Sequence, residues 1–559
     1  MKLFKSFTPA EWLAVIFPLL LLIPNVVLNH TENLPLLSAA TNLFLPLGSY
    51  GLILSLTRRI GVSVLCCLPF MIFSAFQIVL LYLYGESIIA VDMFLNVATT
   101  NPREVSELLG NLLVAIGTVV VLYIPMIVWA IVDLCRRRNL SDMFQRGYRK
   151  VSAVLFIVGV ALLLLSVAFV GGFSVNRDIF PINVIHNLAT AISRAVDAAD
   201  YPITSANFTF GSRPTHSDAE REAYLFVVGE TSRADNWQLL GYGRETNPRL
   251  SVIERLVSFP KALTQSNTTH KSVPMMLSDL TASDFDSINC RKSVITAFKE
   301  AGFHTVFLSN QRRNGSYIDY FGFEADSVVF LKDDGREHID GELVELVGKC
   351  LADTSKRKQF IVLHTYGSHF NYRDRYDDRF SHFVPDRTVD ANASHRAELV
   401  NAFDNTIRYI DSYLADLMTE VETGQWSGAV VYASDHGEDI FDDERNRFLH
   451  SSPVPTAPQL HVPALVWLSS AYIDRHPGKL ENLIGNRECY MSPSVSLFHT
   501  IVDLAGIDFS RRDTTLSLAS GSYSAPAKCY LTDRNEKVAL EHSGLKPLDI
   551  EVLKKKHIL

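Results

Sequence analysis

Two apolar runs of strand type end in residues that could bind a metal. Glu230 directly follows AYLFVVG (223–229), and Asp435 and His436 directly follow AVVYAS (429–434). Two carboxylates and an imidazole are ligands that hold Zn²⁺, or a harder ion such as Mn²⁺. The sequence therefore predicts a metal site to which these three residues contribute.

A hydroxyl that could complete a tetrahedral site lies in QSNTTHKSVPMMLSDL (265–280). SNTT is a cluster of helix-capping residues ahead of a run able to form a helix. A hydroxyl at a helix start faces free backbone N–H groups and the positive end of the helix dipole, where phosphate binds well. A metal would lower the pKa of such a hydroxyl and make it a nucleophile. A plain helix cap is the alternative interpretation.

Other histidines could act on a phosphate held at this site. His364 closes the apolar run FIVLH (360–364), His369 follows five residues later, and His450 lies downstream of DHGE (435–438). Imidazoles can hold phosphate oxygens or protonate a leaving group. We therefore expect His369 and His450 to act on the phosphate.

The elements that must position these residues are those of an α/β sheet. From residue 223 onward, short apolar runs alternate with helical patterns, which is typical of parallel strands joined by helices. Four runs are expected to be buried parallel strands: 223–229, 304–309, 360–364 and 429–434. Ligands of open α/β sheets bind beyond the carboxyl ends of the strands, so the residues that follow these runs point to one shared site.

The first part of the chain has a different composition. Charged side chains are sparse up to residue 176 and frequent after it. Five windows contain no Asp, Glu, Lys or Arg: 12–31, 33–57, 60–85, 108–132 and 151–176. Each is as long as the ~20 apolar residues that a helix needs to cross a bilayer. We expect five membrane spans rather than buried core helices or a cleavable signal peptide.

The charges between these windows predict their orientation. Basic residues precede the first window, follow the second at 58–59 and cluster at 136–150. The loops around 29–35 and 86–107 carry mainly acidic residues. The positive-inside rule then places the N-terminus in the cytoplasm and everything after about residue 176 outside it.

The predicted spans and strands divide the chain into three parts. We expect a membrane domain over 1–176, a linker helix and connector over 177–220, and an exported α/β domain over 221–559. Residues 178–200 have an amphipathic pattern, and the polar segment 86–107 is expected to be a re-entrant or interfacial connector.

Charge and cysteine content restrict the possible functions and bonds. The net charge of −8 and the pI of about 6.1 give no support to nucleic-acid binding. Cys290, Cys350, Cys489 and Cys529 belong to the predicted exported domain, where an oxidising compartment could join them in two disulfides. Free buried thiols are the alternative, and the spacing of the cysteines does not choose among the possible pairings.

The chain resembles the phosphoethanolamine transferases of Gram-negative inner membranes in VVGETSRADNWQLLGYGRETNP (227–248) and ASDHGE (433–438). These enzymes belong to the alkaline phosphatase and sulfatase superfamily and include the lipid A modifiers responsible for polymyxin resistance. The motifs GETSRA, GYxRxTNP, TxxSVP, HTxGSH and DHGE occur in the family's order, and the resemblance covers nearly the whole chain. It implies five spans, a linker helix and an exported alkaline-phosphatase/sulfatase-like α/β domain with a mostly parallel central sheet.

The resemblance implies roles for the residues of the predicted metal site. Glu230, Asp435 and His436 match the family's zinc ligands. Thr269, three residues before the serine of TxxSVP, matches the nucleophile and the fourth ligand, with Thr268 as its nearest rival.

The resemblance also implies residues that contact the substrates. His369 in HTYGSH and His450 in FLHSS match histidines near the transferred phosphate. Within 86–107, Asn96 and Glu104 are similar to residues that contact the lipid-derived donor from the membrane side.

The activity that the resemblance implies is a ping-pong transfer. Thr269 would take phosphoethanolamine from phosphatidylethanolamine, release diacylglycerol and pass the group to lipid A or to the lipopolysaccharide core. We expect a zinc-dependent, monomeric enzyme of the bacterial inner membrane whose catalytic domain lies in the periplasm.

Other classes of protein share the superfamily core. A sulfatase-like hydrolase would mature a Cys or Ser in a CxPxR-like motif, and none surrounds Thr269. A glycerol-phosphate transferase of the lipoteichoic-acid type would have a different loop after the first strand and typically manganese. A non-enzymatic sensor or assembly factor would have lost ligands, and all four are retained.

Overall fold

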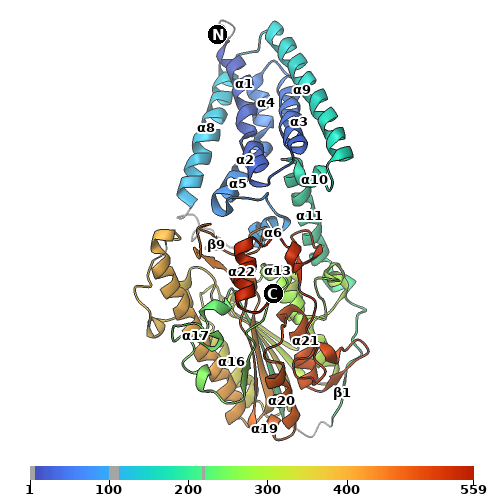
Figure 1. The fold of residues 1–559 in the computed structure, drawn as a ribbon, viewed down its shortest axis with the longest axis vertical. Coiled ribbons are helices and arrows are strands. Elements are labelled where there is room, and N and C mark those ends of the chain that lie inside the picture. Colours follow the sequence, from blue (N-terminus) through green and yellow to red (C-terminus); the bar gives the residue numbers. More distant parts are fainter. Residues whose placement is uncertain (1–6, 100–111, 217–220, 389) are drawn as a thin grey trace. The chain divides into compact units, whose positions relative to one another are not determined.

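The computed structural model describes residues 7–99, 112–216, 221–388 and 390–559 (Figure 1). The chain forms two compact units, Met1–Ser193 and Arg194–Leu559. The boundary between the units falls inside the helix α11 (Ile182–Ala199), which lies in the amphipathic segment 178–200.

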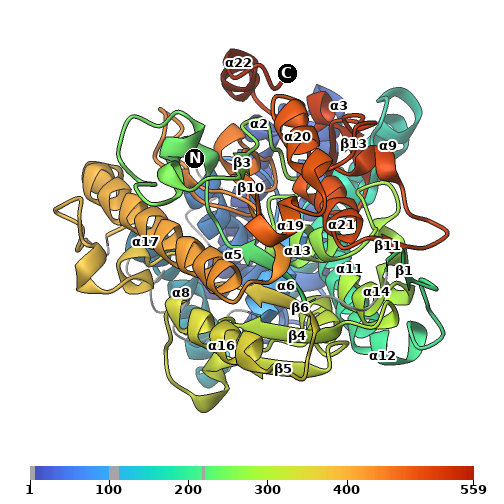
Figure 2. The ribbon, with the colours of Figure 1, turned by 90° about the horizontal axis from the view of Figure 1, so that it is seen from below.

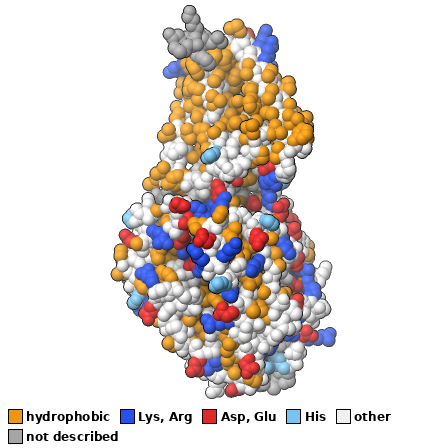
Figure 3. All heavy atoms as spheres, in the orientation of Figure 1, with side chains coloured by type: hydrophobic (Ala, Val, Ile, Leu, Met, Phe, Trp, Pro, Cys, Tyr) orange, Lys and Arg blue, Asp and Glu red, His pale blue; other side chains and the backbone are white. Residues whose placement is uncertain are grey.

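The first unit is helical and largely apolar. In the part of the chain that the structure describes, four helices are long and apolar enough to cross a membrane, or up to five if a bent pair is one span. The four are α1 with α2 (Pro9–Leu21 and Ile23–Thr31), α3 (Leu36–Leu54), α8 (Leu113–Cys135) and α9 (Asp142–Phe169). The pair is α4 (Ile60–Cys66) and α5 (Leu68–Tyr84), bent by 53°. These elements fall on the five charge-free windows, and hydrophobic side chains cover most of the visible face of this unit (Figure 3).

Glycines allow a close helix contact in this unit, between α3 and α9. A Cβ on Gly48 would lie 2.4 Å from the backbone nitrogen of Phe156. A Cβ on Gly159 would lie 2.5 Å from the Cα of Leu45. Because such distances leave no room for a side chain, the two backbones approach closely only with glycine at these positions.

Short helices follow the spans in this unit. The segment expected to be a connector contains α6 (Val91–Thr99), and its remainder from residue 100 lies outside the described residues.

Buried side-chain amides hold the start of α11, which follows the short helix α10 (Val175–Asp178). Asn25 donates to the carbonyl of Phe180 (2.8 Å), and the amide N–H of Phe180 donates to Asn42 (2.9 Å).

The second unit, within its described residues, is built on a seven-stranded sheet of order β3-β10-β7-β2-β6-β4-β5. The strands β7, β2, β6, β4 and β5 are parallel, whereas β10 and β3 run antiparallel to their neighbours. Their bounds are β2 Glu222–Gly229, β3 Leu256–Ser258, β4 His304–Ser309, β5 Ser327–Phe330, β6 Lys358–His364, β7 Ser427–Ser434 and β10 Ala464–Leu468. The four predicted parallel strands are therefore confirmed.

Helices cover both faces of this sheet (Figures 1 and 2). One face carries α16 (Gly341–Ala352) and α17 (Arg396–Thr423), and the other carries α13 (Thr269–Leu277), α14 (Val294–Glu300) and α21 (Pro493–Leu504). On the latter face Tyr224, Phe226 and Val228 of β2 pack into one core with Val273 and Phe298. The remaining helices are α12 Tyr201–Thr204, α15 Tyr317–Gly322, α18 Ala457–Leu460, α19 Ser470–Ile473, α20 Pro477–Asn486 and α22 Pro547–Lys555.

Three small sheets and the cysteines complete the second unit. Two-residue strands β1 (Arg213–Pro214) and β11 (Ile507–Asp508) pair, as do β8 (Asp439–Ile440) and β9 (Phe448–Leu449). The hairpin strands are β12 (Cys529–Leu531) and β13 (Lys537–Ala539). All seven cysteines lie in the described residues and none is bridged. Of the four in the second unit only Cys529 is buried, whereas Cys350 and Cys489 are half-buried and Cys290 is exposed, so the thiols are free but mostly not buried.

Candidate active site

The register of the sheet brings the residues that follow its strands to one edge. Gly229 of β2 pairs with Ser434 of β7, so Glu230 and Asp435 leave neighbouring strands at the same level. On the other side of β2, Val228 pairs with His364 of β6, which precedes the loop of His369. The residues predicted from separate motifs therefore begin from one end of the parallel strands.

The candidate nucleophile lies between two of these residues. Thr269 is the first residue of α13, and its hydroxyl oxygen lies 3.0 Å from Oε1 of Glu230 and 3.0 Å from Nε2 of His436. Thr268 is the N-cap residue but makes no capping bond through its side chain, because its hydroxyl meets Ser266 Oγ at 3.1 Å. The structure therefore brings Thr269, and not Thr268, to the predicted ligands.

The rings and carboxylates of this cluster are oriented by nearby backbone. Nδ1 of His436 lies 3.0 Å from the carbonyl of Gly437, and since a carbonyl only accepts, Nδ1 carries the proton. Nε2 then presents its lone pair to Thr269, 3.4 Å from both Glu230 Oε1 and Asp435 Oδ2. Asp435 Oδ1 accepts backbone N–H bonds from Thr231 (3.2 Å) and His436 (2.7 Å). These bonds set the ring and the carboxylate in the arrangement that metal ligands need.

The electrostatics of the cluster favour a bound cation. Glu230 is 2% exposed, and Asp435 and His436 are 0% exposed. Burial, reinforced by the charge of Asp435, raises the pKa of Glu230 well above its usual value. Burial lowers the pKa of His436 well below its usual value, so the imidazole is neutral, the form that binds metals. Oε2 of Glu230 has no hydrogen-bond partner among the described residues, which a metal would provide. These residues fit a divalent cation.

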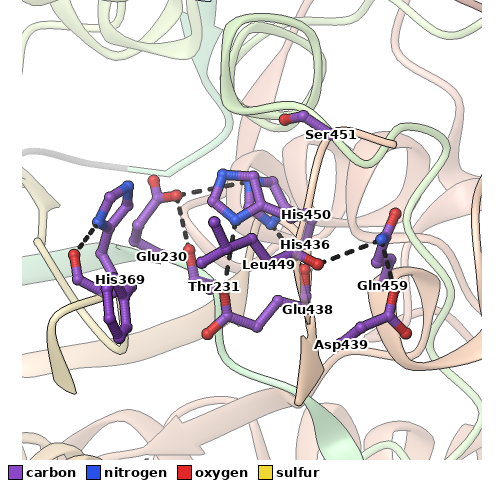
Figure 4. Close-up of polar contacts among 12 residues, drawn as sticks. Glu230, Thr231, His369, His436, Glu438, Asp439, Leu449, His450, Ser451 and Gln459 are labelled. Carbon is purple, nitrogen blue, oxygen red and sulfur yellow. Dashed lines mark hydrogen bonds and ion pairs between the residues drawn. The ribbon is translucent and has the colours of Figure 1, made fainter. Parts of the chain in front are cut away.

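His450, which is predicted to act on the phosphate, lies close enough to Glu230 and His436 to be a metal ligand as well. Ligand atoms of Glu230, His436 and His450 all lie within 4.8 Å of one another, and Figure 4 shows the three side chains gathered together. The rings of His436 and His450 are 4.2 Å apart between centroids. His450 can therefore reach either the metal or a phosphate beside it.

Glu438 is a site residue that the sequence reasoning missed. Its Oε2 lies 3.4 Å from Nδ1 of His450, and the side chain is 0% exposed. Burial raises the pKa of Glu438. The sequence feature that could have indicated Glu438 is its place as the last residue of DHGE, of which only Asp435 and His436 were predicted to be ligands.

His369 completes the group of histidines. Its ring centroid lies 5.7 Å from that of His450, and it stacks on Tyr366 at 5.2 Å. Nδ1 donates to the carbonyl of Phe370 (2.6 Å), which leaves the lone pair on Nε2. Burial, with the charge of His450, lowers the pKa of His369 to about 3, so its ring is neutral.

Two residues of the first unit, Asn96 and Glu104, are predicted to contact the lipid-derived donor substrate. Asn96 lies on α6. Glu104 falls outside the described residues. Both roles stay predictions.

Comparison with known proteins identifies the family. The family described as Sulfatase matches residues 222–507, just over half of the chain, a range that contains the whole seven-stranded sheet and its site. The chain belongs to the sulfatase family.

Relatives of this sulfatase-family protein include phosphoethanolamine transferases. Phosphoethanolamine transferase EptA of Escherichia coli (strain K12) is 29% identical over 463 residues, which cover 79% of this chain and 82% of the relative. The integral membrane protein lipooligosaccharide phosphoethanolamine transferase A (EptA) from Neisseria meningitidis matches with a TM-score of 0.71 at 21% identity, covering 91% of this chain and 97% of that one. The resemblance drawn from the motifs, and the fold of membrane helices followed by a sulfatase-like domain, are thereby confirmed.

A second solved structure resembles the catalytic unit. The C-terminal periplasmic domain of EcEptC from Escherichia coli, in complex with Zn, matches with a TM-score of 0.54 at 23% identity. The match covers 59% of this chain and 95% of that one.

Proposed function

We propose that this protein transfers phosphoethanolamine from phosphatidylethanolamine to lipid A or the lipopolysaccharide core, through a covalent intermediate on Thr269. The observation that supports it most directly is the position of the Thr269 hydroxyl, 3.0 Å from both Glu230 Oε1 and His436 Nε2. A threonine hydroxyl is a weak nucleophile until a base or a metal ionises it. Glu230, which accepts the hydrogen bond of the hydroxyl, would be the base, and the cation proposed below would be the metal. The names of the relatives supply the transferred group.

The proposed cofactor is zinc, with manganese as the harder alternative. Glu230, Thr269, Asp435 and His436 would hold it. When bound, the metal supplies Lewis acidity that lowers the pKa of the Thr269 hydroxyl and offsets negative charge on the phosphoryl oxygens. The buried carboxylates, the neutral imidazole and the zinc complex of a domain with the same fold support this proposal.

The residues of the chain would carry out the transfer in two steps. In the first, the Thr269 hydroxyl gives its proton to Glu230, to which it donates, its oxygen bonds to phosphorus, and the bond from phosphorus to the diacylglycerol oxygen breaks. His450 is placed to protonate that leaving oxygen. In the second, an acceptor oxygen attacks phosphorus and gives up any proton that it carries, the bond from phosphorus to the Thr269 oxygen breaks, and that oxygen takes its proton back from Glu230. Backbone N–H groups at the start of α13 favour the anionic group during both steps.

The proposed location is the bacterial inner membrane, with the catalytic unit in the periplasm and the chain acting as a monomer. The apolar helices of the first unit support insertion in a bilayer. A catalytic unit tethered to the membrane meets a lipid donor at high effective concentration. Asn96 and Glu104 are proposed to contact that donor.

The proposal is tested with the purified full chain in detergent with zinc. We expect release of diacylglycerol from phosphatidylethanolamine and, without acceptor, an added phosphoethanolamine on the peptide that contains Thr269. Phosphatidylglycerol and a sulfate ester serve as rival substrates. Turnover of either of these in place of phosphatidylethanolamine would contradict the proposal and indicate a glycerol-phosphate transferase or a sulfatase-like hydrolase.

A further inference from the structure

The loop that carries His450 has an unusual backbone. The residues on either side of it, Leu449 and Ser451, have φ angles of 68° and 60°. This left-handed region is costly for residues with a side chain, and it persists only where surrounding contacts hold it. A loop with two such residues beside a site histidine therefore needs identifiable contacts that maintain it.

Asn267 provides several of these contacts. Its backbone carbonyl accepts the amide N–H of Ser451 (3.2 Å), and its side-chain Nδ2 donates to the carbonyl of Ser452 (2.8 Å) and to Oε1 of Gln459 (2.7 Å). Oδ1 accepts the hydroxyl of Tyr530 (2.8 Å). The side chain is 2% exposed, so both donors and the acceptor of a buried amide are in use.

Gln459 extends these contacts to the segment that holds His436. Its Nε2 donates to Asp439 Oδ2 (2.7 Å) and to the carbonyl of Leu449 (3.3 Å). Its backbone carbonyl accepts the amide N–H of Gly437 (2.9 Å). In Figure 4 dashed lines join Gln459 to Asp439 and to Leu449. The segments of Thr269, His436 and His450 are thus joined through two buried amides.

We propose that Asn267 is a positioning residue that holds the His450 loop in its left-handed conformation beside Thr269. Asn267 lies two residues before Thr269 on the same approach to α13, whereas Ser451 and Ser452 directly follow His450. The imidazole of His450 lies 3.4 Å from Glu438, whereas the two residues that follow it are held by shorter bonds to Asn267, at 3.2 Å from the Ser451 N–H and 2.8 Å to the Ser452 carbonyl. What His450 does for transfer rests on the proposed function, but its placement by Asn267 does not.

The first test measures the loop without using activity. Hydrogen exchange is followed in the full chain with wild-type protein and Asn267→Ala, and with Asn267→Ser should the alanine variant fail to fold. We expect the amides of 449–452 to exchange at least about tenfold faster in the variant, because the loop loses the side-chain bond from Nδ2 to the Ser452 carbonyl and the link to Gln459, while the bond from Ser451 N–H to the backbone carbonyl of residue 267 remains. Asn486→Ala is the matched control, since its amide also donates to two carbonyls, those of Leu518 and Ser520, both at 2.9 Å. Unchanged exchange at 449–452, or an equal rise in the control, would overturn the proposal.

The second test separates positioning from general stability. Transfer rates are measured for Asn267→Ala, His450→Ala and the double variant. If Asn267 acts through His450, its loss lowers kcat by roughly 10- to 100-fold with little change in KM, and the double variant is no slower than His450→Ala. If the losses in kcat of the two single variants multiply in the double variant, Asn267 acts independently of His450, and the proposal is refuted. Absence of any transfer by the wild type would refute the proposed function, while the exchange result would still decide the role of Asn267.

Discussion

Nε2 of His436 lies 3.0 Å from the hydroxyl of Thr269, while Nδ1 of the same ring lies 3.0 Å from the carbonyl of Gly437. The backbone therefore decides which nitrogen carries the proton, and the lone pair faces the hydroxyl. This relationship selects one threonine of an adjacent pair as the candidate nucleophile.

Replacing the two threonines should give very different losses. We expect Thr269→Ala to lower transfer by at least roughly 1,000-fold, because it removes the attacking oxygen. Thr268→Ala should cost far less, since its hydroxyl contacts Ser266 rather than the cluster. Thr269→Ser should keep some activity. Peptide mass spectrometry after incubation with donor alone locates the added group, and its presence on Thr268 would overturn the assignment.

Metal content should distinguish the proposed ligand Asp435 from His450. Asp435→Asn is expected to weaken zinc binding by more than the roughly 10- to 100-fold that loss of an outer hydrogen-bond partner causes. His450→Ala should keep the metal and lose transfer. Asp439→Asn is the matched control, because Asp439 bonds Thr456 and Gln459 instead of the cluster. Metal lost from His450→Ala but kept by Asp435→Asn would make His450 the ligand.

Stability of the first unit should depend on Gly159 but not on Gly117. A valine at 159 meets the backbone of α3, so Gly159→Val should lower the yield of folded protein and its melting temperature in detergent by several degrees. Apart from the backbone of its own helix and its two chain neighbours, a Cβ on Gly117 would meet no atom of the described residues within 4 Å, so Gly117→Val should be tolerated. Equal effects of the two substitutions would contradict the close packing of α3 and α9.

Acid should destabilise the protein partly through His499 of α21. Burial lowers the pKa of His499 from 6.5 to about 4, with Asp513 opposing and Arg512 reinforcing the shift. The contribution of His499 to the free energy of unfolding is fully present above pH 6.5, where its ring is neutral in both the folded and the unfolded chain. It falls by about 1.4 kcal/mol per pH unit towards 4, because only the unfolded chain takes up the proton. In denaturation of the full chain, His499→Gln should reduce the dependence of stability on pH between 6.5 and 4 by about 1.4 kcal/mol per pH unit, and exposed His542→Gln should leave that dependence unchanged.

The orientation in the membrane can be tested with fusions to the C-terminus. The basic residues at 58–59 and 136–150 predict that residues after about 176 lie outside the cytoplasm. A C-terminal alkaline phosphatase should then be active, and a fluorescent protein that folds only in the cytoplasm should be dark. The opposite pair of results would refute the five-span topology.

Local sequence determined the strands and the residues that follow them. Runs such as AYLFVVG and AVVYAS are apolar throughout because both faces of β2 and β7 are buried, and this pattern survives in the linear sequence. Glu230 and Asp435 could be assigned to one edge because parallel strands end on the same side of a sheet. The membrane spans could likewise be predicted from the charge-free windows, since crossing a bilayer requires a continuous apolar segment.

Tertiary structure alone decided how the loops meet at that edge. Thr268 and Thr269 are equivalent as capping residues, and only the path of the chain into α13 turns one of them toward Glu230 and His436. The same holds for Asn267 and Gln459, whose partners are distant in sequence. Hydrogen bonds between loops depend on the direction of each side chain, and that direction is set by packing around the whole sheet rather than by the residues next to it.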